Sequence, residues 1–197
     1  LTTMGFVLAV AACVAVLVIA LPCYTNGACP TIITREEWNA TDPKIKENLK
    51  EDPPPYVVVH HSVTNTCKTT ADCKALMRSV QDYHMNTNDW EDIGYNFLIG
   101  NDGNIYEGRG WGIHGAHAIP YNSRSLGICL IGNFEDNKPQ NNQLKALKKL
   151  IECSVEENKL TTDYRLIGHS QATATLCPGK YLFEEIKTWS HFDNNPE

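Results

Sequence analysis

The run Tyr56-Val-Val-Val-His60-His61 limits the fold of this chain more than any other stretch. Three consecutive β-branched residues without an alternating polar position are typical of a strand that is buried on both faces of a sheet. A second short apolar run at 164–168 ends directly before His169. Because a sheet that is buried on both faces needs helices on each side, these strands predict an α/β fold.

Helical and strand patterns alternate along the rest of the chain. Helices are expected at about 69–84, 140–158 and 180–189, where apolar residues recur at helical spacing. Further strands are expected at 31–34, 93–100, 104–108 and 126–132, and the residues Asn101-Asp-Gly103 are expected to form a hairpin turn. The prediction is a single α/β domain at 29–197, with a central mixed β-sheet flanked by three helices.

The first 28 residues have a different composition. No charged residue lies between Gly5 and Leu21, where Ala, Val, Leu, Ile and Phe dominate. This pattern predicts a secretory signal peptide at 1–28, cut somewhere after Ala20, and therefore a secreted, extracellular domain. The alternative is a membrane anchor, because an apolar run of about 17–20 residues approaches the length of a membrane span. The lack of a basic cluster after the run favours the signal peptide, and contact with a membrane is expected only if the segment is retained.

Charge and cysteine content indicate which classes of partner are excluded and in which compartment the protein folds. A formal net charge of −6 and a pI of about 5.6 argue against nucleic acid or an anionic membrane as the main partner. Eight cysteines indicate an oxidising compartment. Cys67 and Cys73 are six residues apart in a polar, turn-rich stretch that suits a small disulfide loop, and Cys29 and Cys153 are candidates to fasten the N-terminal tail to a helix.

Three residues offer the ligand set of a catalytic metal site. His60 and His169 each stand at the end of a predicted strand, and Cys177 follows His169 by eight residues. Two imidazoles and a thiolate suit zinc better than magnesium or calcium, and three protein ligands leave a fourth position open. His61 is expected to point to the opposite face, because side chains alternate along a strand. Cys129 is expected to be a buried free thiol, although counting cysteines leaves a Cys129–Cys177 disulfide open.

An ordered set of motifs makes the chain resemble a known family. The motifs are Val-Val-His60-His61-Ser, Asp92-Ile-Gly-Tyr-Asn-Phe-Leu-Ile-Gly100, Tyr-Glu-Gly-Arg-Gly-Trp111, Gly-Ala-His117, and Gly-His169 followed by Cys177-Pro-Gly. Their order and spacing resemble the peptidoglycan recognition protein family, which is related to the zinc N-acetylmuramoyl-L-alanine amidases of phage type. The resemblance implies a sheet with three helices, and an L-shaped groove for muropeptide with Zn²⁺ at its floor. It also implies the disulfides Cys67–Cys73 and Cys29–Cys153.

The resemblance assigns roles to residues around the expected zinc site. Tyr95, expected on a strand, matches the catalytic tyrosine of the family, where a phenol can donate a hydrogen bond to the developing oxyanion or orient the attacking water. Thr175 stands where related enzymes carry Thr or Lys, and it would contact the carbonyl or the water. Non-catalytic members usually carry another residue, often Ser, at the position of Cys177, so this cysteine implies an enzyme.

The same resemblance suggests which residues bind the substrate. His61 is expected either to be structural or to line the groove, and Trp90 and Trp111 either pack in the fold or face the ligand. In family members a Gly-Trp pair at the position of Asp89-Trp90 correlates with a preference for diaminopimelate-type peptidoglycan, and only the tryptophan matches here. Arg124 could pair with the additional carboxylate of diaminopimelate. The expected substrate-binding residues are His61, His84, Trp90, His117, Asn122 and Arg124.

These inferences predict a secreted innate-immunity protein that binds bacterial peptidoglycan. It would hydrolyse the amide between the lactyl group of N-acetylmuramic acid and L-alanine with a zinc-activated water. A first alternative is a non-catalytic peptidoglycan receptor that triggers an immune signalling or protease cascade and binds proteins of that cascade. A second is a secreted, disulfide-stapled domain whose histidines and cysteines are structural, in which Cys177 would be disulfide-bonded.

Overall fold

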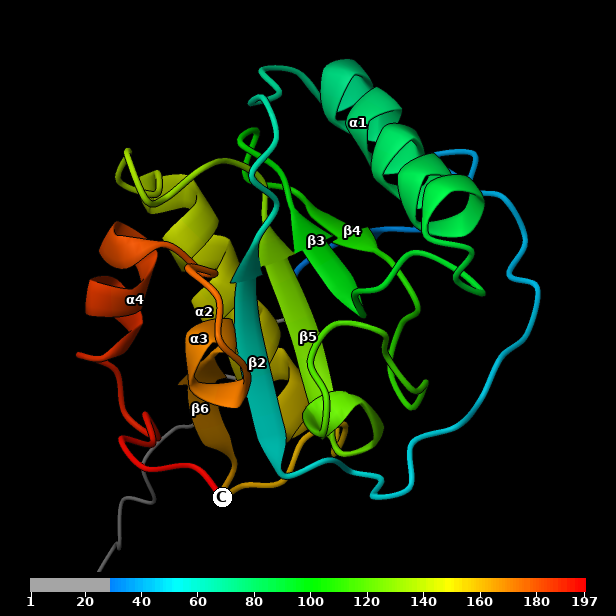
Figure 1. Ribbon diagram of the computed structural model, residues 1–197. Helices are drawn as coiled ribbons and strands as arrows, with labels where there is room; N and C mark the ends of the chain where they lie inside the picture. The colour runs from blue at the N-terminus through cyan, green and yellow to red at the C-terminus, as the bar shows by residue number, and fades with distance from the viewer. Residues whose placement is uncertain (1–28) are drawn as a thin grey trace, which may run out of the picture.

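The computed structural model describes residues 29–197, so the predicted signal peptide at 1–28 lies outside the described residues. Six strands form one sheet: β1 (Ile32–Ile33), β2 (Tyr56–His61), β3 (Phe97–Ile99), β4 (Ile105–Glu107), β5 (Ser125–Leu130) and β6 (Arg165–Gly168). Their order is β1-β4-β3-β5-β2-β6. β3 and β4 form an antiparallel hairpin and all other neighbours are parallel, so the sheet is mixed as predicted (Figure 1).

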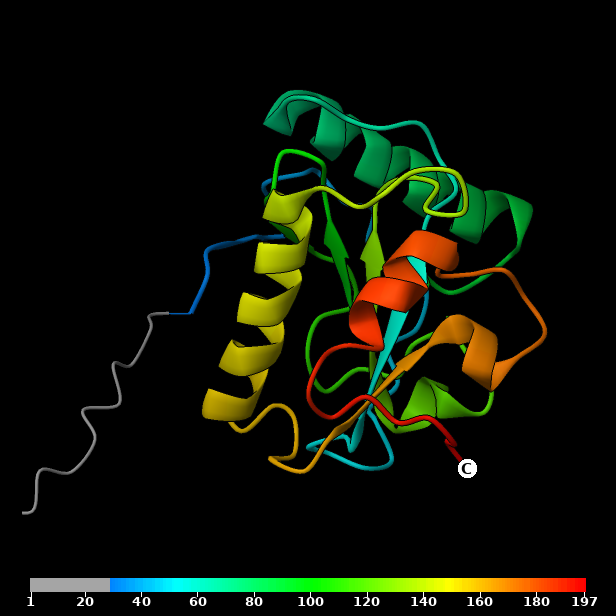
Figure 2. The same ribbon diagram turned by 90° about the vertical axis from the view of Figure 1, so that its left-hand side faces the viewer.

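Three main helices cover the two faces of the sheet. They are α1 (Thr70–Asp82), α2 (Asn141–Glu156) and α4 (Lys180–Ile186). α1 packs over β3 and β4 through Met77 and Val80, whereas α2 and α4 pack on the other face through Leu147, Leu150 and Ile186. Figures 1 and 2 show α1 on one side of the sheet, with α2 and α4 on the other. The predicted fold class is confirmed. Within 29–197, none of the helices has the length and apolar composition needed to cross a membrane.

Capping determines where α1 begins. The Thr69 hydroxyl accepts a hydrogen bond from the Asp72 N–H, and the Asp72 carboxylate accepts one from the Thr69 N–H, which is a reciprocal capping box. Regular α-helical bonding ends at Asp82 and continues as one wider π-helical turn, η1 (Tyr83–Thr87). The helix expected to end at about 84 therefore ends in this turn, which carries the buried His84.

The central strand β2 pairs with β5 on one side and β6 on the other. All six of its residues are buried, as the β-branched run predicts. Val57 and Val59 pack under α2 and α4, whereas Val58 packs on the opposite face. The same alternation sends His60 to the face that carries α1, and His61 to the face that carries α4.

β3 is shorter than the strand predicted at 93–100. The side-chain amide of Asn96 donates hydrogen bonds to the carbonyls of Gly110 and Ile113, and its oxygen accepts one from a backbone N–H of β5. Because the Gly127 N–H bonds to this side chain rather than to a backbone carbonyl, the regular pairing of β3 with β5 begins only at Phe97. Tyr95 consequently precedes the strand. The prediction that it lies on a strand is wrong.

Four of the six cysteines in the described residues form two disulfides. Cys29–Cys153 fastens the start of the domain to α2, and Cys67–Cys73 joins the preceding loop to the first turn of α1. Both pairs match the expectation. Cys129 is a buried free thiol and Cys177 is a partly exposed one, so in this part of the chain the alternative Cys129–Cys177 disulfide is not formed.

Thiol counting tests this arrangement. The unfolded, unreduced chain 29–197 is expected to release two equivalents with a thiol reagent, because two of its six cysteines are free. A Cys129→Ala variant should release one. A count of zero for the parent chain would mean that Cys129 and Cys177 are bonded, and would contradict the structure.

Candidate metal centre and groove

The three predicted metal ligands meet at one edge of the sheet. β2 and β6 run parallel with Val59 opposite Gly168, so the next residues, His60 and His169, leave the two strands side by side. His169 is the first residue of α3 (His169–Ala172), a single helical turn too short to predict from sequence periodicity. Cys177 comes from the loop between α3 and α4 and completes the cluster.

The geometry of this cluster fits a zinc ion. One ligand atom from each of His60, His169 and Cys177 lies within 4.8 Å of the others, and the His60 Nδ1 to Cys177 Sγ distance is 3.7 Å. In a tetrahedral site the ligand atoms lie roughly 3.3–3.8 Å apart, given Zn–N of about 2.0–2.1 Å and Zn–S of about 2.3 Å. Since His169 and Cys177 are partly exposed, one side of the cluster is open to solvent.

Burial sets the protonation of the ligands. It lowers the pKa of His60 well below its usual range, helped by the imidazoles of His117 and His169, and it also lowers the pKa of His169. Both rings are thus neutral at pH 7 and have a lone pair for a metal. Burial raises the pKa of the Cys177 thiol to about 12. The His61 N–H, which donates a hydrogen bond to Sγ at 3.4 Å, lowers this pKa by a smaller amount. A cation bound to the cluster would stabilise the thiolate.

Two candidate catalytic residues lie beside the cluster. The ring of Tyr95 is centred 5.2 Å from that of His60. Burial, and then the neighbouring thiols of Cys129 and Cys177, raises the pKa of Tyr95 well above its usual value, so the phenol keeps its proton and can donate it in a hydrogen bond. The Thr175 hydroxyl accepts a hydrogen bond of 3.2 Å from the Cys177 N–H, which helps to hold the ligand loop in place.

A groove leads away from the cluster. Its first part, a cavity of about 400 Å³, includes His169, Thr173, His117, Ile119 and Asn122 in its lining. Its second part, about 340 Å³, includes Glu47, Asp89, Arg109 and His114. Trp90, Ala116 and Asn122 line both parts, so the two are continuous.

Aromatic rings connect the groove with the metal ligands. Trp90 packs on His84 with ring centroids 4.7 Å apart, and His84 packs on Tyr95 at 5.6 Å. The His84 ring is held by the Gly94 N–H, which donates to Nδ1 at 3.0 Å. Trp90 therefore has one side on His84 and remains 36% exposed toward the groove.

Of the six expected substrate-binding residues, three line the groove, namely Trp90, His117 and Asn122, and a fourth, His84, is buried behind Trp90. Asn122 uses its side-chain oxygen to accept hydrogen bonds from the N–H groups of His117 and Ala118, so it shapes the groove wall.

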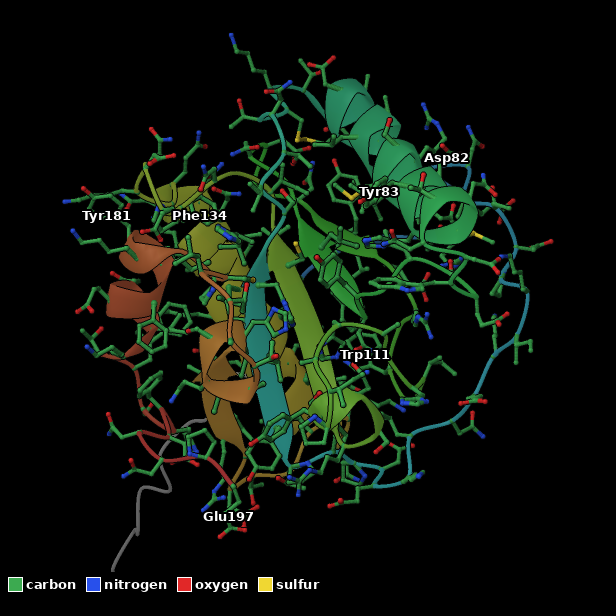
Figure 3. The ribbon with its side chains drawn as sticks, viewed as in Figure 1. Asp82, Tyr83, Trp111, Phe134, Tyr181 and Glu197 are labelled. Atoms are coloured by element: carbon green, nitrogen blue, oxygen red, sulfur yellow. A yellow bond between two sulfur atoms is a disulfide. The ribbon has the colours of Figure 1, made fainter. Side chains whose placement is uncertain are left out.

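The other two expected residues lie elsewhere. The guanidinium of Arg124 stacks over the rings of Tyr56 and Tyr121 at 5.1 and 5.0 Å. His61 is buried on the opposite face, where its Nδ1 accepts a hydrogen bond from the Phe134 N–H at 3.2 Å. Phe134 lies on the α4 side of β2 (Figure 3).

Trp111 packs in the fold rather than in the groove. Its ring lies against Phe97 at 4.8 Å, and its indole N–H donates to the Ser154 hydroxyl at 3.0 Å.

Gly127 is a supporting residue that the sequence analysis did not identify. A Cβ atom on Gly127 of β5 would lie 2.3 Å from a ring carbon of His117, so only glycine leaves room for that ring. The signal was present in the sequence, because a glycine inside an apolar strand often marks the close approach of another group.

Comparison with known proteins identifies the family. A family model described as N-acetylmuramoyl-L-alanine amidase matches residues 50–180. Peptidoglycan-recognition protein 2 of Holotrichia diomphalia is 46% identical over 171 residues, which cover 86% of this chain and 90% of that protein. The chain belongs to the peptidoglycan recognition protein family. This confirms the resemblance drawn from the motifs.

Solved structures of the family share the fold described above. Drosophila peptidoglycan recognition protein SA is 43% identical with a TM-score of 0.84, covering 86% of this chain and 97% of that one. Peptidoglycan recognition protein-LE, solved in complex with tracheal cytotoxin, a monomeric diaminopimelic acid-type peptidoglycan, is 44% identical with a TM-score of 0.81. That match covers 83% of this chain and 96% of the other.

Acid is expected to destabilise this domain through its buried histidines. Burial, and then the charge of Arg109, lowers the pKa of His84 to about 4; burial, and then the imidazole of His169, lowers that of His117 to about 3. Below pH 6.5 the unfolded chain therefore binds more protons than the folded chain. The free energy of unfolding that the two neutral histidines contribute is complete above pH 6.5 and falls as the pH drops toward their folded-state pKa values. Each group contributes a slope of up to about 1.4 kcal/mol per pH unit.

Urea unfolding of the metal-free protein between pH 7 and 4.5 measures this slope. His84→Asn keeps an acceptor near the Gly94 N–H and removes the titration, so its slope should be shallower by up to about 1.4 kcal/mol per pH unit. Equal slopes for this variant and the parent, or an NMR titration of His84 near pH 6.5, would contradict the prediction.

Proposed function

We propose that this protein binds bacterial peptidoglycan and hydrolyses the amide between N-acetylmuramic acid and L-alanine in a zinc-dependent reaction. The observation that carries the proposal is the cluster of His60, His169 and Cys177, whose ligand atoms converge within 4.8 Å at the end of the groove. A protein that only binds peptidoglycan needs the groove but has no need for two imidazoles and a thiol in this arrangement.

The groove suits a ligand made of sugar and peptide. The exposed face of Trp90 offers an apolar surface, and backbone and polar side-chain groups around Asn122 and Arg109 offer hydrogen-bonding partners. The relative that was solved with tracheal cytotoxin supports a muropeptide as the ligand. Trp90 and this relative also favour diaminopimelate-type peptidoglycan as the preferred substrate, whereas the stacking of Arg124 on two tyrosines gives that preference no support.

The chain's own residues supply the remaining catalytic groups. His60, His169 and Cys177 would hold the zinc, which when bound supplies a Lewis acid for the carbonyl and a water of lowered pKa. Tyr95, protonated at all ordinary pH values, donates a hydrogen bond to the oxygen on which negative charge develops. Thr175 is exposed at the surface, and its hydroxyl helps to hold the loop that carries Cys177.

We place this activity outside the cell, in innate immunity. The two disulfides are typical of an oxidising compartment, and the relatives are recognition proteins for a bacterial polymer. The non-catalytic receptor remains the rival function, and the following experiment separates the two.

Release of stem peptide from purified peptidoglycan is expected with zinc and not with a chelator. Cys177→Ser should lower the release at least about 100-fold, because the serine hydroxyl is a poor zinc ligand. Binding of the variant to insoluble peptidoglycan should remain close to that of the parent, which shows that the groove is intact. Tight binding without release by the zinc-loaded parent would leave only the receptor function.

Tyr95→Phe tests the hydrogen bond to the oxyanion. The substitution removes one hydroxyl and is expected to lower kcat about 100-fold with little change in KM or in bound zinc. Steady-state kinetics and metal analysis of the two proteins provide the comparison. If kcat stays within about threefold of the parent, the phenol does not act on the reacting atoms.

A further inference from the structure

We propose that His117 is a positioning residue for the metal ligand His60, and that Ser125 determines which nitrogen of His117 carries the proton. This inference rests on the zinc site proposed above and gives His117 a role beyond lining the groove. The His117 Nδ1 atom lies 3.0 Å from His60 Nε2, and the two rings are nearly perpendicular, with an interplanar angle of 81°. His60 thus has one nitrogen facing His117 and the other, Nδ1, facing Cys177 at 3.7 Å.

The direction of the hydrogen bonds follows from Ser125. Its hydroxyl donates to the Tyr121 carbonyl at 2.7 Å, so its oxygen has only lone pairs left for His117 Nε2, which lies 3.5 Å away. Nε2 of His117 must therefore carry the proton, and Nδ1 of the same neutral ring must be the acceptor. His60 then donates from Nε2–H, and its Nδ1 lone pair points at the metal cluster.

The opposite assignment of the ring protons fails both at Ser125 and at Cys177. A proton on His117 Nδ1 would leave a lone pair on Nε2 facing the lone pairs of Ser125. It would also move the His60 proton to Nδ1, where it would occupy the side that faces Cys177 and block coordination. We therefore assign the Nε2–H form to both histidines.

The position of the His117 ring is closely determined by its surroundings. A Cβ atom on either Gly115 or Gly127 would lie 2.3 Å from a ring carbon of His117, so the ring packs directly on the backbone at both places. The backbone of His117 is held by Asn122, whose side-chain oxygen accepts from its N–H at 2.7 Å. A ring held this way can keep His60 in one rotamer and one tautomer, which are the two properties that a metal ligand needs.

The assignment changes what His117 offers to a substrate. The ring lines the groove, but both of its nitrogens are engaged inside the protein. His117 therefore presents carbon atoms to a bound muropeptide and contributes to binding by contact rather than by a hydrogen bond.

A matched pair of variants tests the proposal. Asn and Leu have nearly the same shape, but the Asn oxygen can replace Nδ1 as the acceptor and Leu cannot. Chelator competition on metal-free protein should show that His117→Leu binds zinc about 10–100-fold more weakly than the parent. His117→Asn should stay within about threefold. The unfolding free energies of the two metal-free variants, measured alongside, correct for any difference in folding.

Four results would overturn the proposal. Parent-like zinc affinity in both variants, with only peptidoglycan binding reduced, would make His117 a substrate contact. Equal losses in both would show that the acceptor is not the feature that matters. In the zinc-loaded parent, ¹H–¹⁵N NMR that found the proton on His117 Nδ1 would contradict the assignment without using any variant. If the parent itself binds no zinc, the proposed function fails together with this inference, whereas the other results leave that function intact.

Discussion

The pairing of β2 with β5 and β6 is the interaction on which the rest of the molecule depends. It buries both faces of one strand, so each residue of β2 is committed to one side of the sheet. Apolar side chains on one side build the core with α2 and α4. On the other side β2 carries His60 near its end, and His169 directly follows the end of its parallel partner β6. A shift of register by one residue would exchange His60 with His61 and remove the candidate metal site.

Burial also controls the chemistry of the site. The same low-polarity surroundings keep the histidines neutral, keep the proton on Tyr95 and make the Cys177 thiol a weak acid. Neutral imidazoles and a protonated phenol are the forms that a metal ligand and an oxyanion donor require. The buried polar atoms of His60, His117 and Ser125 have partners, because they form a chain of hydrogen bonds that ends on the Tyr121 carbonyl.

The architecture agrees with the residue patterns, and the three candidate metal ligands that the sequence suggested lie together. The three helices, the mixed sheet and both disulfides agree with expectation. The strand around Tyr95 was predicted too long, because a run of apolar residues does not show that Asn96 binds three backbone groups from other segments. The placement of Arg124 also could not be predicted, since the tyrosines under its guanidinium come from β2 and from the loop before β5.

The sequence by itself determined the three main helices, most of the strands and the candidate metal ligands, because helical and strand periodicity and metal-binding residue types are local properties of the chain. Only the tertiary structure decided which nitrogen of His60 faces Cys177, that His117 lies behind it, and that Gly127 makes space for that ring. These features depend on distances between segments far apart in the sequence. Such distances are set by how the strands pair and how the loops pack, and no local pattern contains them.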